Sequence, residues 1–152
     1  MAEHHAPLDD PASPSTRLES QIGFHLRRAY QRATANLADA IGEAVTPQQL
    51  AVLARLAEAG AVSQNRLGRQ VDMDPATIHG VVRRLAARGL IDIAPDPEDR
   101  RRSRLSLSPA GHKQMAELGP LSKQADRKTG ACLSMEERAT LLALLRRVAD
   151  RG

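Results

Sequence analysis

Arginines and small polar residues gather in two short stretches of the sequence, and their spacing could let both stretches bind DNA. In residues 75–88, at 3.6 residues per turn, one side of a helix would carry Thr77, His79, Gly80, Arg83, Arg84 and Arg88. Hydroxyl, imidazole and guanidinium groups can bond to base edges and phosphates, and a glycine permits close approach to a groove. An amphipathic helix with a solvated basic face would show the same pattern, so this stretch does not decide the function alone.

The second stretch is a loop that two prolines stiffen and that carries Arg100, Arg101 and Arg102. Arginine is the side chain that narrow minor grooves attract, and it also pairs with phosphates. The same loop contains acidic residues, which are Asp96, Glu98 and Asp99. We expect these carboxylates to hold the arginines in fixed directions through ion pairs. A metal site built from the same carboxylates is the alternative.

Local signals define the helix that would present the first stretch. Asp74 is a good N-cap, and Pro75 suits the first helical position because its missing N–H costs nothing there. Gly89 can take the left-handed conformation that often follows a helix. The predicted apolar stripe of this helix consists of Ile78, Val81, Val82 and Leu85.

A shorter helix should precede it, because Ser63 is a good cap and Leu67 and Val71 form an apolar i, i+4 pair. Residues 72–74 then form a turn of helix-turn-helix length. After Gly89, residues 90–93 and 104–108 have strand patterns on either side of the arginine-rich loop, which predicts a β-hairpin. Helix, turn, helix and hairpin together predict a winged helix-turn-helix within residues 46–108.

Three motifs give this chain a resemblance to the MarR family of bacterial transcription regulators, and the likeness extends from about Leu18 to the end. The motifs are TPQQLAVLARLAEAG at 46–60, DPATIHGVVRRLAARGLI at 74–91 and DPEDRRRSRLSLSPAG at 96–111. The third is the most specific, since it is similar to the family's wing signature. The resemblance implies a mainly α fold with a small β-hairpin wing. It also implies a homodimer whose recognition helices enter successive major grooves, wings in the adjacent minor grooves, and control by a small molecule or an oxidant.

The patterns and the resemblance together give a predicted DNA-binding set. It consists of Ser63, Gln64, Arg66, Pro75, Thr77, His79, Gly80, Arg83, Arg84, Arg100, Arg101 and Arg102. We expect Arg66, Arg84 and the wing to contact phosphates of double-stranded DNA, and Arg101 to enter the minor groove. Base edges would be contacted by Thr77, His79 and Arg83. The two-fold symmetry of a dimer predicts a pseudo-palindromic operator with half-sites about one helical turn apart.

Residues 18–41 should form a long helix whose apolar stripe becomes small in the middle. The stripe consists of Leu18, Ile22, Leu26, Ala29, Ala33, Leu37 and Ala40. The candidate effector-binding residues beside it are Phe24, His25, Arg27, Arg28 and Tyr30. The resemblance implies that this helix joins the dimerisation region and lines an effector pocket. The hypothesised effector is an aromatic carboxylic acid or its CoA thioester, because arginine can bind a carboxylate through two hydrogen bonds. A surface helix with solvated arginines is the alternative.

Capping signals predict the remaining helices. Thr46 and Gln49 form a capping box before a helix whose inward residues are Leu50, Leu53, Leu56 and Ala57. Ser108 caps a helix that Gly119-Pro120 should kink or divide, and the sequence does not say which. Ser134 and Glu137 form a second capping box, which opens the last helix. Its leucines are too many for one narrow stripe, which predicts a partner surface.

The domain organisation that follows is a disordered tail at 1–16 and one MarR-like domain at 17–152. Within that domain, residues 17–45 and 109–152 would be dimerisation helices on either side of the winged helix-turn-helix.

Composition sets limits on the alternatives. The chain has 152 residues, a net charge of +4 and one cysteine, Cys132, so no intrachain disulfide is possible. No signal peptide or long apolar run is found, so no membrane partner is predicted and a cytoplasmic location is expected. Enzyme motifs such as HExxH or CxxC are lacking, and no cofactor or metal is predicted. The adjacent histidines at 4 and 5 are interpreted as solvated side chains of the tail and not as a metal site. The open alternatives are a redox-responsive regulator sensing through Cys132, a winged-helix protein-interaction module, and activation in place of repression.

Overall fold

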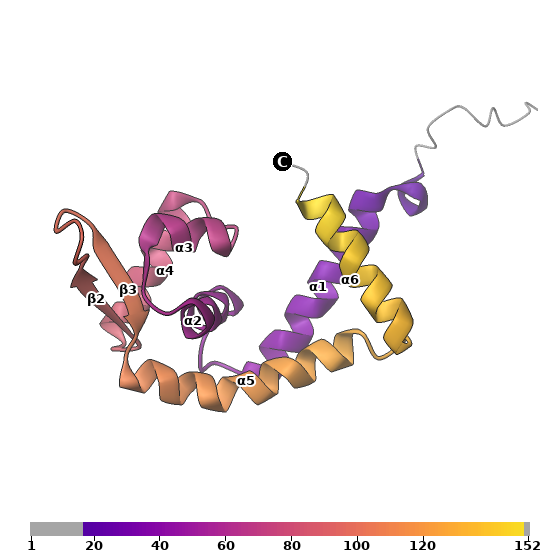
Figure 1. Cartoon of the computed structure of the whole chain (residues 1–152). Helices are drawn as coiled ribbons and strands as arrows, with labels where there is room; N and C mark the ends of the chain where they lie inside the picture. Colours follow the sequence, from indigo (N-terminus) through magenta and orange to yellow (C-terminus); the bar gives the residue numbers. More distant parts are fainter. Residues whose placement is uncertain (1–16, 151–152) are drawn as a thin grey trace, which may run out of the picture.

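The computed structural model describes residues 17–150 and shows two groups of elements joined by one long helix (Figure 1). The predicted mainly α fold with a small wing is confirmed. The elements are η1 (Leu18–Ser20), α1 (Ile22–Ile41), α2 (Pro47–Ala59), β1 (Val62–Ser63), α3 (Gln64–Gln70), α4 (Pro75–Ala87), β2 (Ile91–Pro95), β3 (Ser103–Leu107), α5 (Pro109–Thr129) and α6 (Met135–Ala149). In Figure 1, α2 to α4 and the strands lie together, α1 and α6 lie apart from them, and α5 spans both groups. The predicted tail at 1–16 lies outside the described residues.

Side-chain caps start five of the helices at the predicted residues, because each oxygen accepts a free amide of the first turn. The caps are Thr46, Ser63, Asp74, Ser108 and Ser134. The capping boxes predicted for α2 and α6 are both present.

The wing belongs to a three-stranded antiparallel sheet in which β3 is the central strand. The predicted hairpin pairs Ile91 with Leu107, and its register continues to Pro95 and Ser103. The third strand, β1, was not predicted, and it pairs Val62 with Leu105. This strand lies at one edge of the sheet and leads directly into α3.

The core lies almost wholly between α2, α3, α4 and the sheet. Its largest fully buried side chains are Leu53, Leu56, Leu67, Ile78, Leu85, Leu105, Val52 and Val81. One expectation of inward orientation was wrong. Ala57 is exposed, while Val52 is completely buried, so the buried side of α2 is rotated toward Val52. Residues 18–41, predicted as one helix, form η1 and α1 with the extended residue Gln21 between them. Leu18 and Ile22 of the predicted stripe are 52% and 71% exposed in the single chain.

The helix α5 is continuous from Pro109 to Thr129 with Pro120 inside it, so Gly119-Pro120 does not divide it. Its first turn packs closely on the turn after α4, since a Cβ on Gly111 would overlap the carbonyl oxygen of Leu90. Its second half packs along α1, where Asn36 Nδ2 donates to Thr129 Oγ1 at 3.0 Å. Within residues 17–150, none of the helices is long and apolar enough to cross a membrane.

Candidate nucleic-acid interface

The helix α4 has the orientation predicted from its periodicity. Its four stripe residues are buried, and the core therefore fixes which side faces outward. His79, Arg83 and Arg84 are exposed, and Thr77 and Gly80 are half-buried. The outward side therefore presents an imidazole and two guanidinium groups to solvent, and the helix is anchored behind them by aliphatic packing.

Two hydrogen bonds lock the N-terminus of α4. Asp74 Oδ1 accepts the Thr77 amide at 2.8 Å, and Asp74 Oδ2 accepts the Thr77 hydroxyl at 2.7 Å. These bonds from the backbone and the side chain of Thr77 lower the pKa of Asp74, because they stabilise the charged carboxylate. The hydroxyl proton of Thr77 is directed at Asp74, so its oxygen can act toward a base only as an acceptor.

Gly80 provides space for an arginine. A Cβ at this position would lie 3.5 Å from Arg84 Nη1 and 4.0 Å from Arg84 Cζ. The guanidinium of Arg84 therefore lies beside Gly80 on the outward side of α4. Because Gly80 has no side chain, this guanidinium can lie close to the backbone of α4.

The other predicted residues of the helix-turn-helix lie at helix starts. Ser63 is half-buried, and its hydroxyl oxygen accepts the Arg66 amide at 3.4 Å as the cap of α3. Gln64 is half-buried in the first turn of α3, Arg66 is exposed in the same turn, and Pro75 is exposed at the start of α4.

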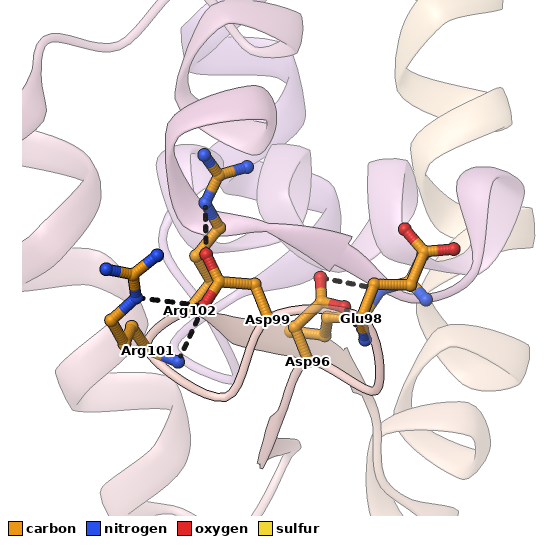
Figure 2. Close-up of polar contacts among 6 residues, drawn as sticks. Asp96, Glu98, Asp99, Arg101 and Arg102 are labelled. Atoms are coloured by element: carbon orange, nitrogen blue, oxygen red, sulfur yellow. Dashed lines mark hydrogen bonds and ion pairs between the residues drawn. The ribbon is translucent and has the colours of Figure 1, made fainter.

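The wing arginines are braced by carboxylates, as predicted (Figure 2). Asp99 Oδ1 accepts Arg101 Nε at 3.3 Å, and Asp99 Oδ2 lies 3.4 Å from Arg102 Nε. Asp96 pairs with Arg104 at 3.9 Å, and Arg104 also donates to the carbonyl of Ala61 at 3.1 Å. The side chains of Arg101 and Arg102 are still 92% and 74% exposed. Both guanidinium groups are therefore oriented and also accessible to a ligand.

Glu98 does not take part in this bracing, contrary to our expectation. Its backbone amide donates to Asp96 Oδ1 at 2.9 Å, and its carboxylate points away from the arginines (Figure 2). Arg100 is exposed on the same loop. Among residues 17–150, no group of three or more His, Cys, Asp or Glu side chains could hold a metal ion.

Arg88 differs from the prediction that placed it beside Arg84 on the outward side. Its Nη2 donates to the carbonyl of Ala44 at 2.7 Å, and its Nη1 donates to Gln49 Oε1 at 3.4 Å. The first acceptor lies in the connection between α1 and α2, and the second lies in the first turn of α2. Arg88 therefore makes contacts within the protein, which sequence periodicity alone could not distinguish from a DNA-facing position.

The predicted effector residues on α1 include an aromatic ring with two arginines beside it. The guanidinium carbons of Arg27 and Arg28 lie 5.8 and 5.5 Å from the ring centroid of Phe24. His25 Nε2 lies 2.8 Å from the carbonyl oxygen of Glu19. Of the predicted residues, Tyr30 instead lines a mainly apolar groove.

This groove, of about 700 Å³, is formed by α1, the end of α5 and α6. Its lining includes Tyr30, Arg32, Cys132, Arg138, Leu142 and Leu145. Arg32 and Arg138 were not among the predicted residues. Arg138 forms an ion pair with Asp126, so part of its charge is already compensated.

Similarity to known proteins identifies the family. Residues 45–102 match the family model described as MarR family. The HTH-type transcriptional repressor NicR of Pseudomonas putida is 36% identical over 146 residues, which cover 95% of this chain and 90% of NicR. The chain belongs to the MarR family. It is therefore a transcriptional regulator of the MarR type, as the sequence motifs predicted, and its relatives are regulators and not enzymes.

Solved structures of MarR-family proteins have the same fold. BpsR of Bordetella bronchiseptica, whose DNA binding is regulated by 6-hydroxynicotinic acid, is 35% identical with a TM-score of 0.87. That match covers 92% of this chain and all of BpsR. PcaV of Streptomyces coelicolor, in complex with its natural ligand, is 34% identical with a TM-score of 0.84, and the match covers 91% of this chain and 99% of PcaV.

Proposed function

We propose that this MarR-family protein is a homodimeric repressor that a small aromatic carboxylic acid releases from a pseudo-palindromic operator. The observation that carries the proposal is the pairing of an outward basic side on α4 with a wing whose arginines are braced and exposed. In this proposal α4 is the recognition helix. NicR, a named repressor that is similar over nearly the whole chain, supports repression in place of activation.

The contacts expected of each element follow from its geometry. Arg83, His79 and the acceptor oxygen of Thr77 would meet base edges in the major groove. Arg84 and Arg66, which are both exposed, would meet phosphates, and the wing arginines would reach the minor groove and its phosphates. We place Ser63, Gln64, Pro75 and Gly80 in the same interface as residues that shape the helix starts and permit close approach.

The exposed apolar residues of α6 support the proposal of a dimer. None of its residues is buried, although it carries four leucines and a valine that are 37–57% exposed. Leu141, Leu142 and Leu145 line the groove that α6 forms with α1. A second copy of the chain is the occupant we propose, because a two-fold interface would cover both apolar helices at once and would pair two recognition helices. Residues 17–45 and 109–152 would then be the dimerisation helices.

The proposed effector class rests on the relatives and on α1. The DNA binding of BpsR is regulated by 6-hydroxynicotinic acid, which is an aromatic carboxylic acid. Phe24 with Arg27 and Arg28 beside its ring offers an aromatic face and two cations within one segment of α1. A CoA thioester of such an acid would use the same aromatic ring but would require a longer open site.

Selection of duplexes from a random library tests the DNA part of the proposal. We expect enrichment of one pseudo-palindrome with half-sites about one helical turn apart. Recovery of no sequence above background would refute the proposal. Calorimetry with 6-hydroxynicotinic acid and benzoic acid, and with hexanoic acid as the non-aromatic control, then tests the effector class. If neither aromatic acid binds, the proposed effector class is refuted and the DNA part of the proposal is unaffected.

The oligomeric state tests the dimer through a matched pair of variants. Light scattering should show a dimer for the wild type and a monomer for Leu142→Glu, since a charge would enter the apolar groove. Ala143→Glu places the same charge on an exposed alanine of α6 that does not line the groove, and should remain dimeric. A monomeric wild type, or equal behaviour of the two variants, would contradict this interface.

A further inference from the structure

The side chain of Arg88 joins the end of the recognition helix to the corner where α1 is followed by α2. Its two terminal nitrogens have separate acceptors, the Ala44 carbonyl at 2.7 Å and Gln49 Oε1 at 3.4 Å. Both partners are about forty residues away in sequence, so the contact is tertiary. A guanidinium is suited to such a link because its donors lie in one rigid plane and it remains charged at any working pH.

The recognition helix does not need this side chain for its own C-terminus. The backbone amides of Arg88, Gly89 and Leu90 already donate to carbonyls of the last turn, at 3.2, 2.9 and 3.0 Å. Gly89 has φ +67, which is the left-handed conformation that permits this arrangement. The Arg88 side chain is therefore free to act outside α4.

The acceptors of Arg88 belong to a rigid corner. Gln49 is buried, and its Oε1 also accepts the Thr46 amide at 3.0 Å in the capping box of α2. The neighbouring side chains of Ile41 and Val45 are each 4% exposed and belong to the core cluster. The corner therefore connects the end of α1 to the start of α2 through buried contacts.

We propose that Arg88 is a positioning residue that sets the direction of the recognition helix relative to α1. The inference rests on the proposed function, since it assigns to Arg88 a role in DNA binding without a contact to DNA. The helix α1 is itself held to α5 by the bond between Asn36 and Thr129 and borders the groove proposed for the second copy. Movement of α1 would reach the recognition helix through the corner and Arg88.

A distance measurement tests the positioning directly and needs neither DNA nor effector. Spin labels on Ala38→Cys in α1 and Ala87→Cys in α4, both exposed, are placed in a Cys132→Ser background and diluted with unlabelled protein. We expect one narrow distance distribution for the reference protein and a broadened or shifted one with Arg88→Ala. Arg84→Ala should leave the distribution unchanged. A distribution that Arg88→Ala does not alter would overturn the inference.

The salt dependence of DNA affinity separates positioning from direct binding of phosphate. Arg88→Ala should weaken binding about threefold to tenfold, the equivalent of one or two hydrogen bonds, without changing the slope of log affinity against log salt. Arg84→Ala should weaken binding and also reduce that slope by about 0.9 for each phosphate that is no longer neutralised. Arg88→Lys, which keeps a donor for the Ala44 carbonyl, should recover most of the affinity and the narrow distribution.

Two results would contradict this role of Arg88 in DNA binding. An affinity that Arg88→Ala leaves unchanged would show that the link does not serve binding. A slope reduced as in Arg84→Ala would show that Arg88 binds phosphate in the complex. A wild-type protein that binds no duplex would instead refute the proposed function, and the distance measurement would still decide whether Arg88 fixes the recognition helix.

Discussion

Replacement of Ser108 by alanine should destabilise the protein more than the loss of an ordinary helix cap. The Ser108 hydroxyl accepts the Gly111 amide at 3.0 Å and donates to the Gly89 carbonyl at 2.6 Å, and the residue is 5% exposed. Removal of the cap costs about 1 kcal/mol. The Gly89 carbonyl, left without its donor in a half-buried position, costs about 1 kcal/mol more. The expected total is about 2 kcal/mol.

Ser134→Ala provides the matched control. Ser134 caps α6 by accepting the Glu137 amide at 3.2 Å, but it is exposed, so water can replace the missing bond. Its expected cost is about 0.5 kcal/mol, near the lower limit for a cap. Urea unfolding followed by circular dichroism at one fixed protein concentration measures both, because the proposed dimer would make stability depend on concentration. Equal losses for the two variants would refute the assignment of a second, tertiary role to Ser108.

The winged helix-turn-helix leads to three further predictions. Gly111→Ala should cost about 3 kcal/mol or more by thermal unfolding, because its Cβ would overlap the Leu90 backbone carbonyl; a loss below that of Ser108→Ala would contradict this packing. The pKa of Asp74 is lowered by its bonds from Thr77, so its contribution to stability should be complete above the ordinary value of 3.8 and lost as pH falls through the folded pKa. Asp74→Asn keeps a cap and cannot titrate, so the stability of this variant relative to the wild type should rise only toward acid pH. A difference in stability between the two proteins that does not change with pH would contradict this role of the carboxylate. Asp99→Asn should lower the ratio of specific to non-specific DNA affinity by up to about thirtyfold for each subunit, because Asp99 pairs with both Arg101 and Arg102 and each exposed ion pair contributes at most about 1 kcal/mol. An unchanged ratio would show that the bracing has no role.

The helix starts could be predicted because their signals are local. Thr46 with Gln49, and Asp74 with Pro75, each fix a first turn through bonds within four residues. The strand β1 could not be predicted, because two residues carry no pattern and their pairing with β3 depends on the tertiary fold. The continuity of α5 through Pro120 likewise depends on packing against other elements, which sequence does not specify.

The candidate site shows the same division. The outward orientation of Arg83 and Arg84 followed from the buried stripe of α4, and the bracing of the wing by Asp99 followed from the unusual acids in a basic loop. The bond of Arg88 to Ala44 was not predictable, because a flanking position on a helix can face either solvent or a neighbouring segment.

The central claim is that the recognition helix and the wing of each subunit bind phosphates of one duplex, and the salt dependence of affinity for the selected operator tests it most directly. Arg66, Arg84 and one wing arginine in each subunit would neutralise about six phosphates in the proposed dimer, so the expected slope of log affinity against log salt is about −5. A slope near zero would contradict the claim.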